Sequence, residues 1–144
     1  MGFGVSRDEE VIVLDTSAVL AVIFREPFAA RLIERLAVDD ERVISVGSYI
    51  EAGTVLAGRR RDAAGAIGDL NAFVVEFAIE LRPVDEEQAR IALDARIRFG
   101  RGMGHGGSLN FGDCFSYALA RSLDAPLLYI GQDFAATDVK SALD

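Results

Sequence analysis

The chain has 144 residues and a mass of 15.5 kDa, a size typical of one domain. Its single cysteine and single histidine exclude an internal disulfide and a zinc site built on several thiolates or imidazoles, so any bound metal must be held by oxygen. The 23 acidic residues exceed the 15 basic ones, for a net charge of −8, which argues against capture of nucleic acid over a wide basic face.

The sequence predicts neither a membrane span nor a signal peptide. The longest apolar stretch, residues 11–24, is interrupted at Asp15 and falls short of the roughly 20 residues that a membrane span requires. The first residues lack the basic segment of a signal peptide. We therefore expect an N-terminal arm over residues 1–10 and one cytoplasmic domain over residues 11–144, with no membrane contact.

Short apolar runs alternate with segments of helical periodicity along the chain. The run at residues 11–14 is typical of a strand buried on both faces, and an S-x-x-E pattern at residues 48–51 is typical of a capping box that opens a helix. Strands are predicted over residues 11–14, 42–46, 81–84 and 127–130. Helices are predicted over residues 17–24, 27–38, 48–57, 63–80, 85–99 and 111–123.

This alternation predicts a three-layer α/β domain, a parallel sheet flanked by helices. Ligands bind such sheets beyond the carboxyl ends of the strands. Asp15, Glu51 and Asp133 each follow a predicted strand, and Asp113 lies at the start of a helix after the cap residue Asn110. We expect these acids to meet at one edge of the sheet.

Each acid also has a purely structural interpretation. Asp15 is suited to cap a helix, Glu51 to close the capping box, and Asp113 to favour the positive end of a helix dipole. Together, however, converging carboxylates repel one another unless a cation neutralises them. Oxygen ligands without Cys or His favour Mg²⁺ or Mn²⁺, and such a site suits phosphodiester hydrolysis by water that the metal activates.

Four segments carry a resemblance to a known family. They are Val-Leu-Asp-Thr-Ser-Ala at residues 13–18, Tyr-Ile-Glu-Ala at 49–52, Asn-Phe-Gly-Asp-Cys-Phe-Ser-Tyr-Ala-Leu-Ala at 110–120, and Leu-Leu-Tyr-Ile-Gly-Gln-Asp-Phe at 127–134. The acids in them are separated by 36, 62 and 20 residues. The chain resembles the PIN-domain ribonucleases of the VapC toxin type over about residues 11–139, and the segment around Asp113 is the most specific part.

The resemblance implies a Mg²⁺-dependent endoribonuclease toxin that cuts RNA, assembles as a homodimer and is blocked by a cognate VapB-type antitoxin. By residue-to-residue match, Asp15 and Asp113 are metal ligands, Glu51 is the third acid, and Thr16 or Ser17 is the hydroxyl beside the site. Many members place the fourth acid in a T-x-D turn, whereas here Gly-Gln precedes Asp133. Asp133 is therefore the candidate for the fourth acid, with Asp138 as the alternative.

Two other functions compete with a nuclease. A phosphoacceptor receiver domain has a similar acidic pocket, but it needs a lysine at a strand end, and the sole lysine here is Lys140. A PIN-fold binding module with little activity is the second alternative. The glycine-rich residues 100–107 lack the G-K-[ST] ending of a phosphate-binding loop, so we expect a mobile flap there and interpret His105 as a solvated loop residue.

Overall fold

The structure is a computed structural model that describes residues 10–38, 40–104 and 106–144. The expected N-terminal arm and His105 therefore lie outside the described residues, apart from Glu10. The strands are β1 (Val11–Leu14), β2 (Glu41–Ser45), β3 (Ile79–Arg82) and β4 (Leu127–Leu128). The helices are α1 (Thr16–Ile23), α2 (Ala29–Leu36), α3 (Val46–Arg59), α4 (Ala63–Glu76), α5 (Glu86–Phe99) and α6 (Asp113–Leu123).

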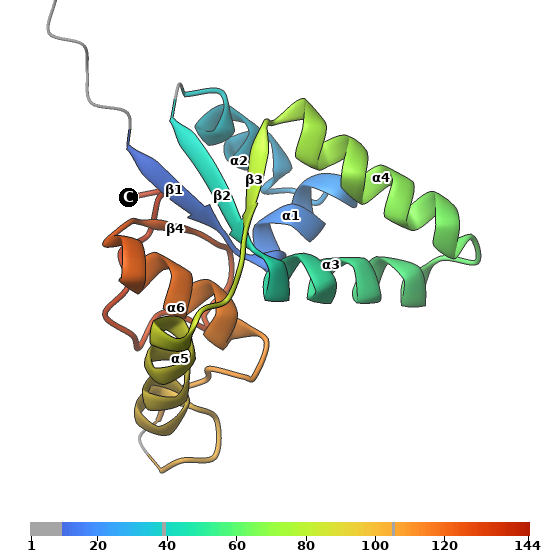
Figure 1. Ribbon diagram of the computed structural model, residues 1–144. Coiled ribbons are helices and arrows are strands. Elements are labelled where there is room, and N and C mark those ends of the chain that lie inside the picture. The colour runs from blue at the N-terminus through green and yellow to red at the C-terminus, as the bar shows by residue number, and fades with distance from the viewer. Residues whose placement is uncertain (1–9, 39, 105) are drawn as a thin grey trace, which may run out of the picture.

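The strands form one parallel sheet in the order β3-β2-β1-β4 (Figure 1). Leu14 at the end of β1 pairs with Ile44 of β2 and with Leu128 of β4. The strand ends therefore lie side by side, and the residues that follow them share one edge of the sheet. This edge is the one at which the sequence predicts the acids to meet.

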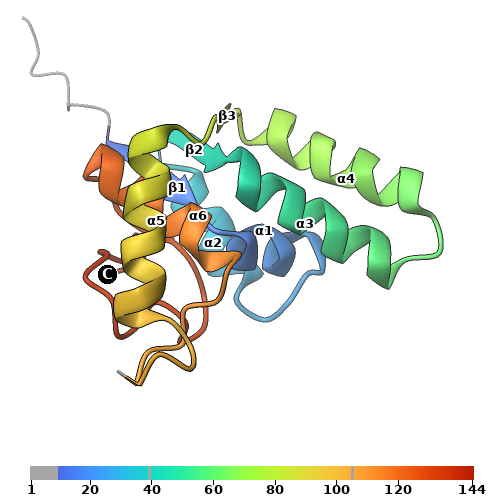
Figure 2. The same ribbon diagram turned by 60° about the horizontal axis from the view of Figure 1, so that its bottom comes forward.

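The sheet separates two apolar cores because successive side chains of a strand point to opposite faces. Ile12 and Leu14 pack against helices α1 to α4, whereas Val13 packs on the other face with α5 and α6. Figure 2 shows α5 and α6 lying side by side on that second face. The predicted three-layer α/β architecture is thus confirmed.

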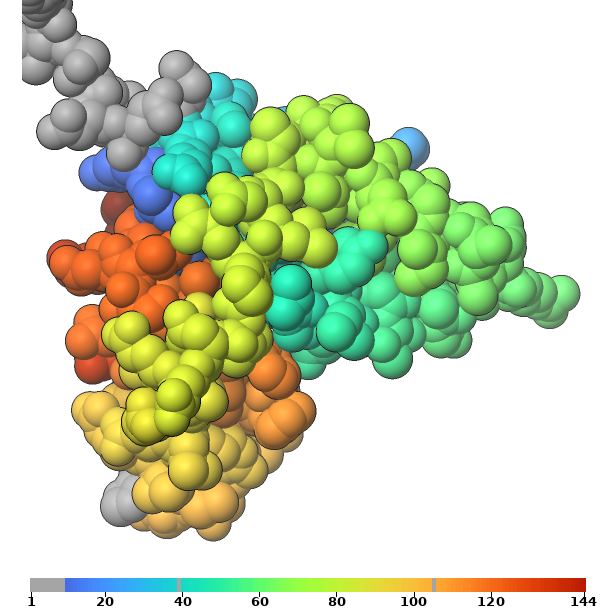
Figure 3. All heavy atoms as spheres, in the orientation of Figure 1, coloured from blue at the N-terminus to red at the C-terminus, as the bar shows by residue number. Residues whose placement is uncertain are grey.

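Helices α3 and α4 form an arm that extends away from the sheet. Figure 3 shows this arm meeting the body of the molecule at a concave angle, opposite the segment that leads into α6. The turn between the two helices spans residues 60–62, and Arg60 makes an ion pair with Asp69 of α4 across the turn. No helix in the described part of the chain has the length and apolar character that a bilayer crossing requires.

Several predicted boundaries were wrong, and two of the corrections have a clear local cause. The helix predicted over residues 63–80 ends at Glu76, because Ala78 adopts a left-handed conformation (φ 51°) that turns the chain into β3, two residues earlier than predicted. The last strand ends at Leu128 and not at Ile130, because the Ile130 N–H donates to Ser17 Oγ at 3.2 Å instead of to a neighbouring strand.

The glycine-rich segment is anchored where it begins and ends. Gly100 pairs with Leu109 in an isolated parallel bridge, and the Arg101 N–H donates to the Leu109 carbonyl at 3.0 Å. Leu109 is fully buried, so the segment returns to the core immediately before the turn that carries Asp113. Gly102 and Gly104 have positive φ values of 84° and 82°, a conformation that glycine adopts readily.

Candidate active site

Asp15 is both a helix cap and a member of the site. It ends β1 as the N-cap of α1, and its Oδ2 accepts from the Ser17 N–H at 3.0 Å. Its Oδ1 accepts a second hydrogen bond, at 2.6 Å, from the Ser116 hydroxyl on α6. The side chain is almost fully buried, and this burial raises the pKa of Asp15 although the hydrogen bonds oppose the shift.

Glu51 has no part in a capping box, so that structural interpretation was wrong. Helix α3 begins at Val46 with Ser45 as its N-cap, whose hydroxyl accepts from the Gly47 N–H at 3.2 Å. Glu51 therefore lies in the second turn, free to face the other acids. Burial raises the pKa of Glu51, the Thr16 hydroxyl lowers it, and the charges of Asp15 and Asp133 raise it further.

Asp113 is held by a reciprocal pair of hydrogen bonds with Asn110. The Asn110 N–H donates to Asp113 Oδ2 and the Asp113 N–H donates to Asn110 Oδ1, both at 2.9 Å. The expected start of this helix was wrong: α6 begins at Asp113 with Gly112 as its N-cap, and Asn110 instead closes the turn before the helix. Burial raises the pKa of Asp113 to about 7, the Asn110 N–H opposes the shift, and the charges of Asp15, Asp133 and Glu51 add to it.

Asp133 and Asp138 have different surroundings. Asp133 follows the turn at Gly131 (φ 90°), and its charge acts on both Glu51 and Asp113. Asp138 accepts a hydrogen bond from the Tyr117 hydroxyl and lies 3.9 Å from Arg121 Nη2. Its burial would raise the pKa of Asp138, but the Tyr117 hydrogen bond and Arg121 outweigh that effect and lower it. Asp138 is thus engaged with α6 and not with the other acids.

The structure also identifies two site residues that the sequence interpretation missed. The Ser48 and Ser116 hydroxyls lie 2.8 Å apart in the buried interior between α3 and α6. Each serine is three residues from an acid, Glu51 or Asp113, and residues three apart share a face of a helix. That spacing is the signal by which sequence reasoning could have found them.

The site therefore gathers acids from separate segments within electrostatic reach of one another. Asp15 comes from the end of β1, Glu51 from α3, Asp113 from the start of α6, and Asp133 from the turn after β4. Within residues 10–38, 40–104 and 106–144, no three His, Cys, Asp or Glu side chains already form a metal-binding group. What the site has is concentrated negative charge, which a divalent cation would neutralise.

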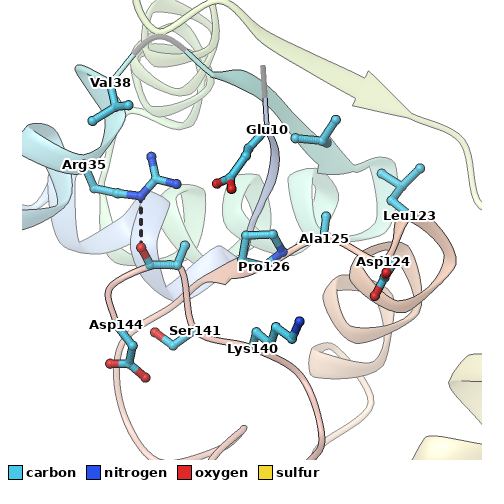
Figure 4. A pocket seen from close by; sticks show the side chains of 12 residues that line it. Glu10, Arg35, Val38, Leu123, Asp124, Ala125, Pro126, Lys140, Ser141 and Asp144 are labelled. Carbon is cyan, nitrogen blue, oxygen red and sulfur yellow. Dashed lines mark hydrogen bonds between the residues drawn. The ribbon is translucent and has the colours of Figure 1, made fainter. Parts of the chain in front are cut away.

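Lys140 lies at the opposite end of the sheet. It lines a pocket with Val11, which begins β1, and Pro126, which immediately precedes β4 (Figure 4). The pocket therefore opens at the amino ends of the strands, across the sheet from the acids. This position does not fit a receiver domain, in which a lysine must reach the acidic pocket.

Known proteins match the chain in both sequence and fold. The PIN domain family model matches residues 12–140. Ribonuclease VapC28 of Mycobacterium tuberculosis is 45% identical over 133 residues, which cover 92% of this chain and 98% of that protein. Ribonuclease VapC of Mycolicibacterium smegmatis is 40% identical over 128 residues, which cover 89% of this chain and 97% of the relative.

Solved structures of low sequence identity share the fold. One is VapC20 of Mycobacterium tuberculosis, described as a sarcin-ricin loop cleaving toxin, with a TM-score of 0.72, 18% identity and coverage of 89% of this chain and 95% of that one. Another is VapBC2 of Rickettsia felis bound to a DNA fragment from its promoter, with a TM-score of 0.72, 15% identity and coverage of 91% and 96%. The sequence comparisons give the family and the structural comparisons agree with the parallel α/β fold: this chain belongs to the PIN-domain family, among the VapC ribonucleases.

Proposed function

We propose that this protein is a metal-dependent endoribonuclease toxin that hydrolyses RNA phosphodiester bonds. The observation that carries the proposal is the convergence of Asp15, Glu51, Asp113 and Asp133 at one edge of the sheet, where burial first, and then the charges of the other three acids, raise the pKa of Asp113. Four segments far apart in the sequence bring these carboxylates together. Such mutual repulsion is costly in a folded protein unless a cation relieves it.

The residues present fit a hard divalent cation. They offer carboxylate oxygens, the donors that Mg²⁺ and Mn²⁺ prefer, and the sole cysteine, Cys114, is packed in the core. In our proposal Asp15, Asp113 and Asp133 hold the ion, and Glu51 is the fourth carboxylate beside it. When bound, Mg²⁺ supplies Lewis-acid charge at the phosphate and makes water more acidic.

The chain's own groups account for positioning. Helices α1 and α6 both begin at the site, and their N-terminal N–H groups and dipoles favour a bound phosphate. Glu51 is assigned to orient the attacking water, as the family resemblance implies for the third acid, and it is available for this role because it takes no part in capping α3. Thr16 Oγ1 donates to the Ser48 carbonyl at 3.0 Å and so joins α1 to α3 beside the acids.

The proposed partners follow from the relatives. The solved structures include VapBC complexes from Rickettsia felis and Haemophilus influenzae. We therefore propose that a VapB-type antitoxin with a basic segment blocks the acidic edge, since opposite charges attract. An RNA substrate, a homodimer and a cytoplasmic location complete the proposal.

Metal-dependent cleavage of RNA by the purified chain tests this function. Total RNA is incubated with the protein in Mg²⁺, in Mn²⁺ and in EDTA, beside the Asp113→Asn variant as the matched control. We expect cleavage by the wild-type chain in either metal, and none in EDTA or with the variant. Cleavage that persists equally in EDTA would contradict the metal requirement.

The same experiment decides between a nuclease and a PIN-fold binding module. A folded chain that leaves RNA intact in every metal, yet binds a co-encoded small basic protein, would favour the binding module. Equal cleavage by Asp113→Asn and wild type would show that the acids are not the active site.

A further inference from the structure

Two buried serine hydroxyls connect the three helices that border the acids. Ser116 on α6 lies 2.8 Å from Ser48 on α3, measured between their Oγ atoms, and donates to Asp15 Oδ1 at 2.6 Å. Both serines are 0% exposed. The connection runs from α3 through α6 to the N-cap of α1.

The hydrogen bonds have one direction. The Ser116 hydroxyl has a single proton and donates it to Asp15. Ser116 can then only accept from its other neighbour, so Ser48 donates to Ser116. Ser48 therefore acts on Asp15 through Ser116 and not directly.

Each serine also lies one helical turn from an acid. Ser116 follows Asp113 by three residues on α6, and Ser48 precedes Glu51 by three residues on α3. Side chains at this spacing share a helix face. A hydrogen bond between the two hydroxyls therefore sets the distance between the helices that carry Glu51 and Asp113. The hydrogen bond from Ser116 to Asp15 fixes the position of the third acid relative to those two helices.

We infer that Ser48 and Ser116 are positioning residues that hold the mutually repelling acids at the spacing one divalent cation requires. This inference rests on the proposed function. Each oxygen of Asp15 accepts one hydrogen bond, from Ser17 N–H or from Ser116, and a carboxylate oxygen has a further lone pair to offer an ion. Groups that hydrogen-bond to metal ligands fix the orientation of those ligands.

The binding of Mn²⁺ to the purified full chain, measured by calorimetry without RNA, tests the inference. We expect Ser116→Ala to weaken Mn²⁺ binding by about tenfold, as loss of such supporting groups does at other metal sites. The matched control is Ser122→Ala on the same helix, whose hydroxyl donates only to the Leu119 carbonyl at 2.9 Å. This control should bind Mn²⁺ as the wild type does.

A double-mutant cycle separates positioning from simple packing. Because Ser48 acts through Ser116, Ser48→Ala should weaken Mn²⁺ binding less than Ser116→Ala and should add nothing in the Ser116→Ala background. Circular dichroism establishes whether each variant is folded. If Ser116→Ala does not fold, Ser48→Ala still tests the inference.

The outcomes distinguish this inference from the proposed function. If wild type binds Mn²⁺ and a folded Ser116→Ala or Ser48→Ala variant binds it equally well, the positioning role is overturned while the metal site stands. Additive effects of the two substitutions also overturn it. If the wild-type chain itself binds no Mn²⁺, the proposed metal dependence fails and the inference fails with it.

Discussion

The carboxylate of Glu51 lies directly against Gly112, so closely that a Cβ atom at position 112 would overlap with it. The backbone of Gly112 has ordinary helical angles, with φ −62° and ψ −38°. Glycine therefore allows the close approach of the Glu51 carboxylate, whose flexible end would have to move to admit a Cβ atom, while the backbone conformation itself makes no demand for glycine. The residue before Asp113 thus determines where the acid of α3 can sit.

Gly112→Ala should reduce RNA cleavage by at least tenfold, because a displacement of about 1 Å at a reacting group can lower the rate by two orders of magnitude. The added methyl group must displace the Glu51 carboxylate from its present position. Initial rates on a defined RNA, with circular dichroism to establish folding, measure the effect.

Gly68→Ala is the matched control for that substitution. Gly68 lies within α4, and a Cβ atom there would have no neighbour within 4 Å. Cleavage should be unchanged, and the free energy of unfolding should rise by roughly 0.5–1 kcal/mol because alanine favours a helix interior. If Gly112→Ala cleaves as fast as Gly68→Ala, the proposed role of Glu51 is wrong.

Asp15→Asn should abolish cleavage while the chain remains folded. Asparagine also caps helices and retains an oxygen that can accept from the Ser17 N–H, the contact that Asp15 makes now. The variant loses the charge that a cation needs, and its amide group takes the place of Oδ1, where the Ser116 hydroxyl must then accept instead of donate. RNA cleavage and thermal melting test this together, and a folded variant with wild-type cleavage would remove Asp15 from the site.

Without divalent metal, the protein should be less stable at pH 8 than at pH 5. The pKa of Asp113 is raised to about 7 from its usual 3.8, so between these values the folded state binds more protons than the unfolded state. Stability then falls as pH rises through that interval. A loss of about 1–3 kcal/mol is expected, measured by urea unfolding in EDTA.

Asp113→Asn provides the control for this pH dependence. The variant has no proton to lose at position 113, so its free energy of unfolding should change less between pH 5 and pH 8 and should exceed that of the wild type at pH 8. A wild-type chain that is equally stable at both pH values in EDTA would show that burial and the neighbouring acids do not raise the pKa of Asp113.

Asp133→Asn and Asp138→Asn should separate the two candidates for the fourth acid. Asp133 acts on Glu51 and Asp113, so its loss should slow cleavage and weaken metal binding. Asp138 accepts from Tyr117, so its loss should lower stability by about 1 kcal/mol and leave cleavage intact. The reverse pattern in cleavage assays would assign the role to Asp138.

The sequence by itself determined the architecture and the candidate acids. Apolar runs alternating with helical periodicity specify a parallel α/β sheet, because such runs are stable only when both faces are covered. The run at residues 11–14 ends at Asp15, and the acid therefore falls at a strand end. Local patterns were sufficient for these conclusions because they concern single strands and helices.

Local patterns were misleading where two interpretations share one motif. Ser48 and Glu51 match a capping box, yet Ser45 already caps the helix. Both residues therefore lie within the helix, past its first position. The start of α3 depends on where β2 ends, and the pairing of β2 with its neighbours decides that. A four-residue motif contains no information about such pairing.

Only the tertiary structure decided how the acids relate to one another. Asp15 and Ser116 are 101 residues apart in the chain but share a hydrogen bond. Asp133 and Asp138 both follow β4 in the chain, yet Asp138 accepts a hydrogen bond from Tyr117 and does not join the other acids. Hydrogen bonds and electrostatic repulsion depend on distance in space, which the packing of α3 and α6 against the sheet sets. For that reason the sequence identified the acids, and the fold determined which of them meet.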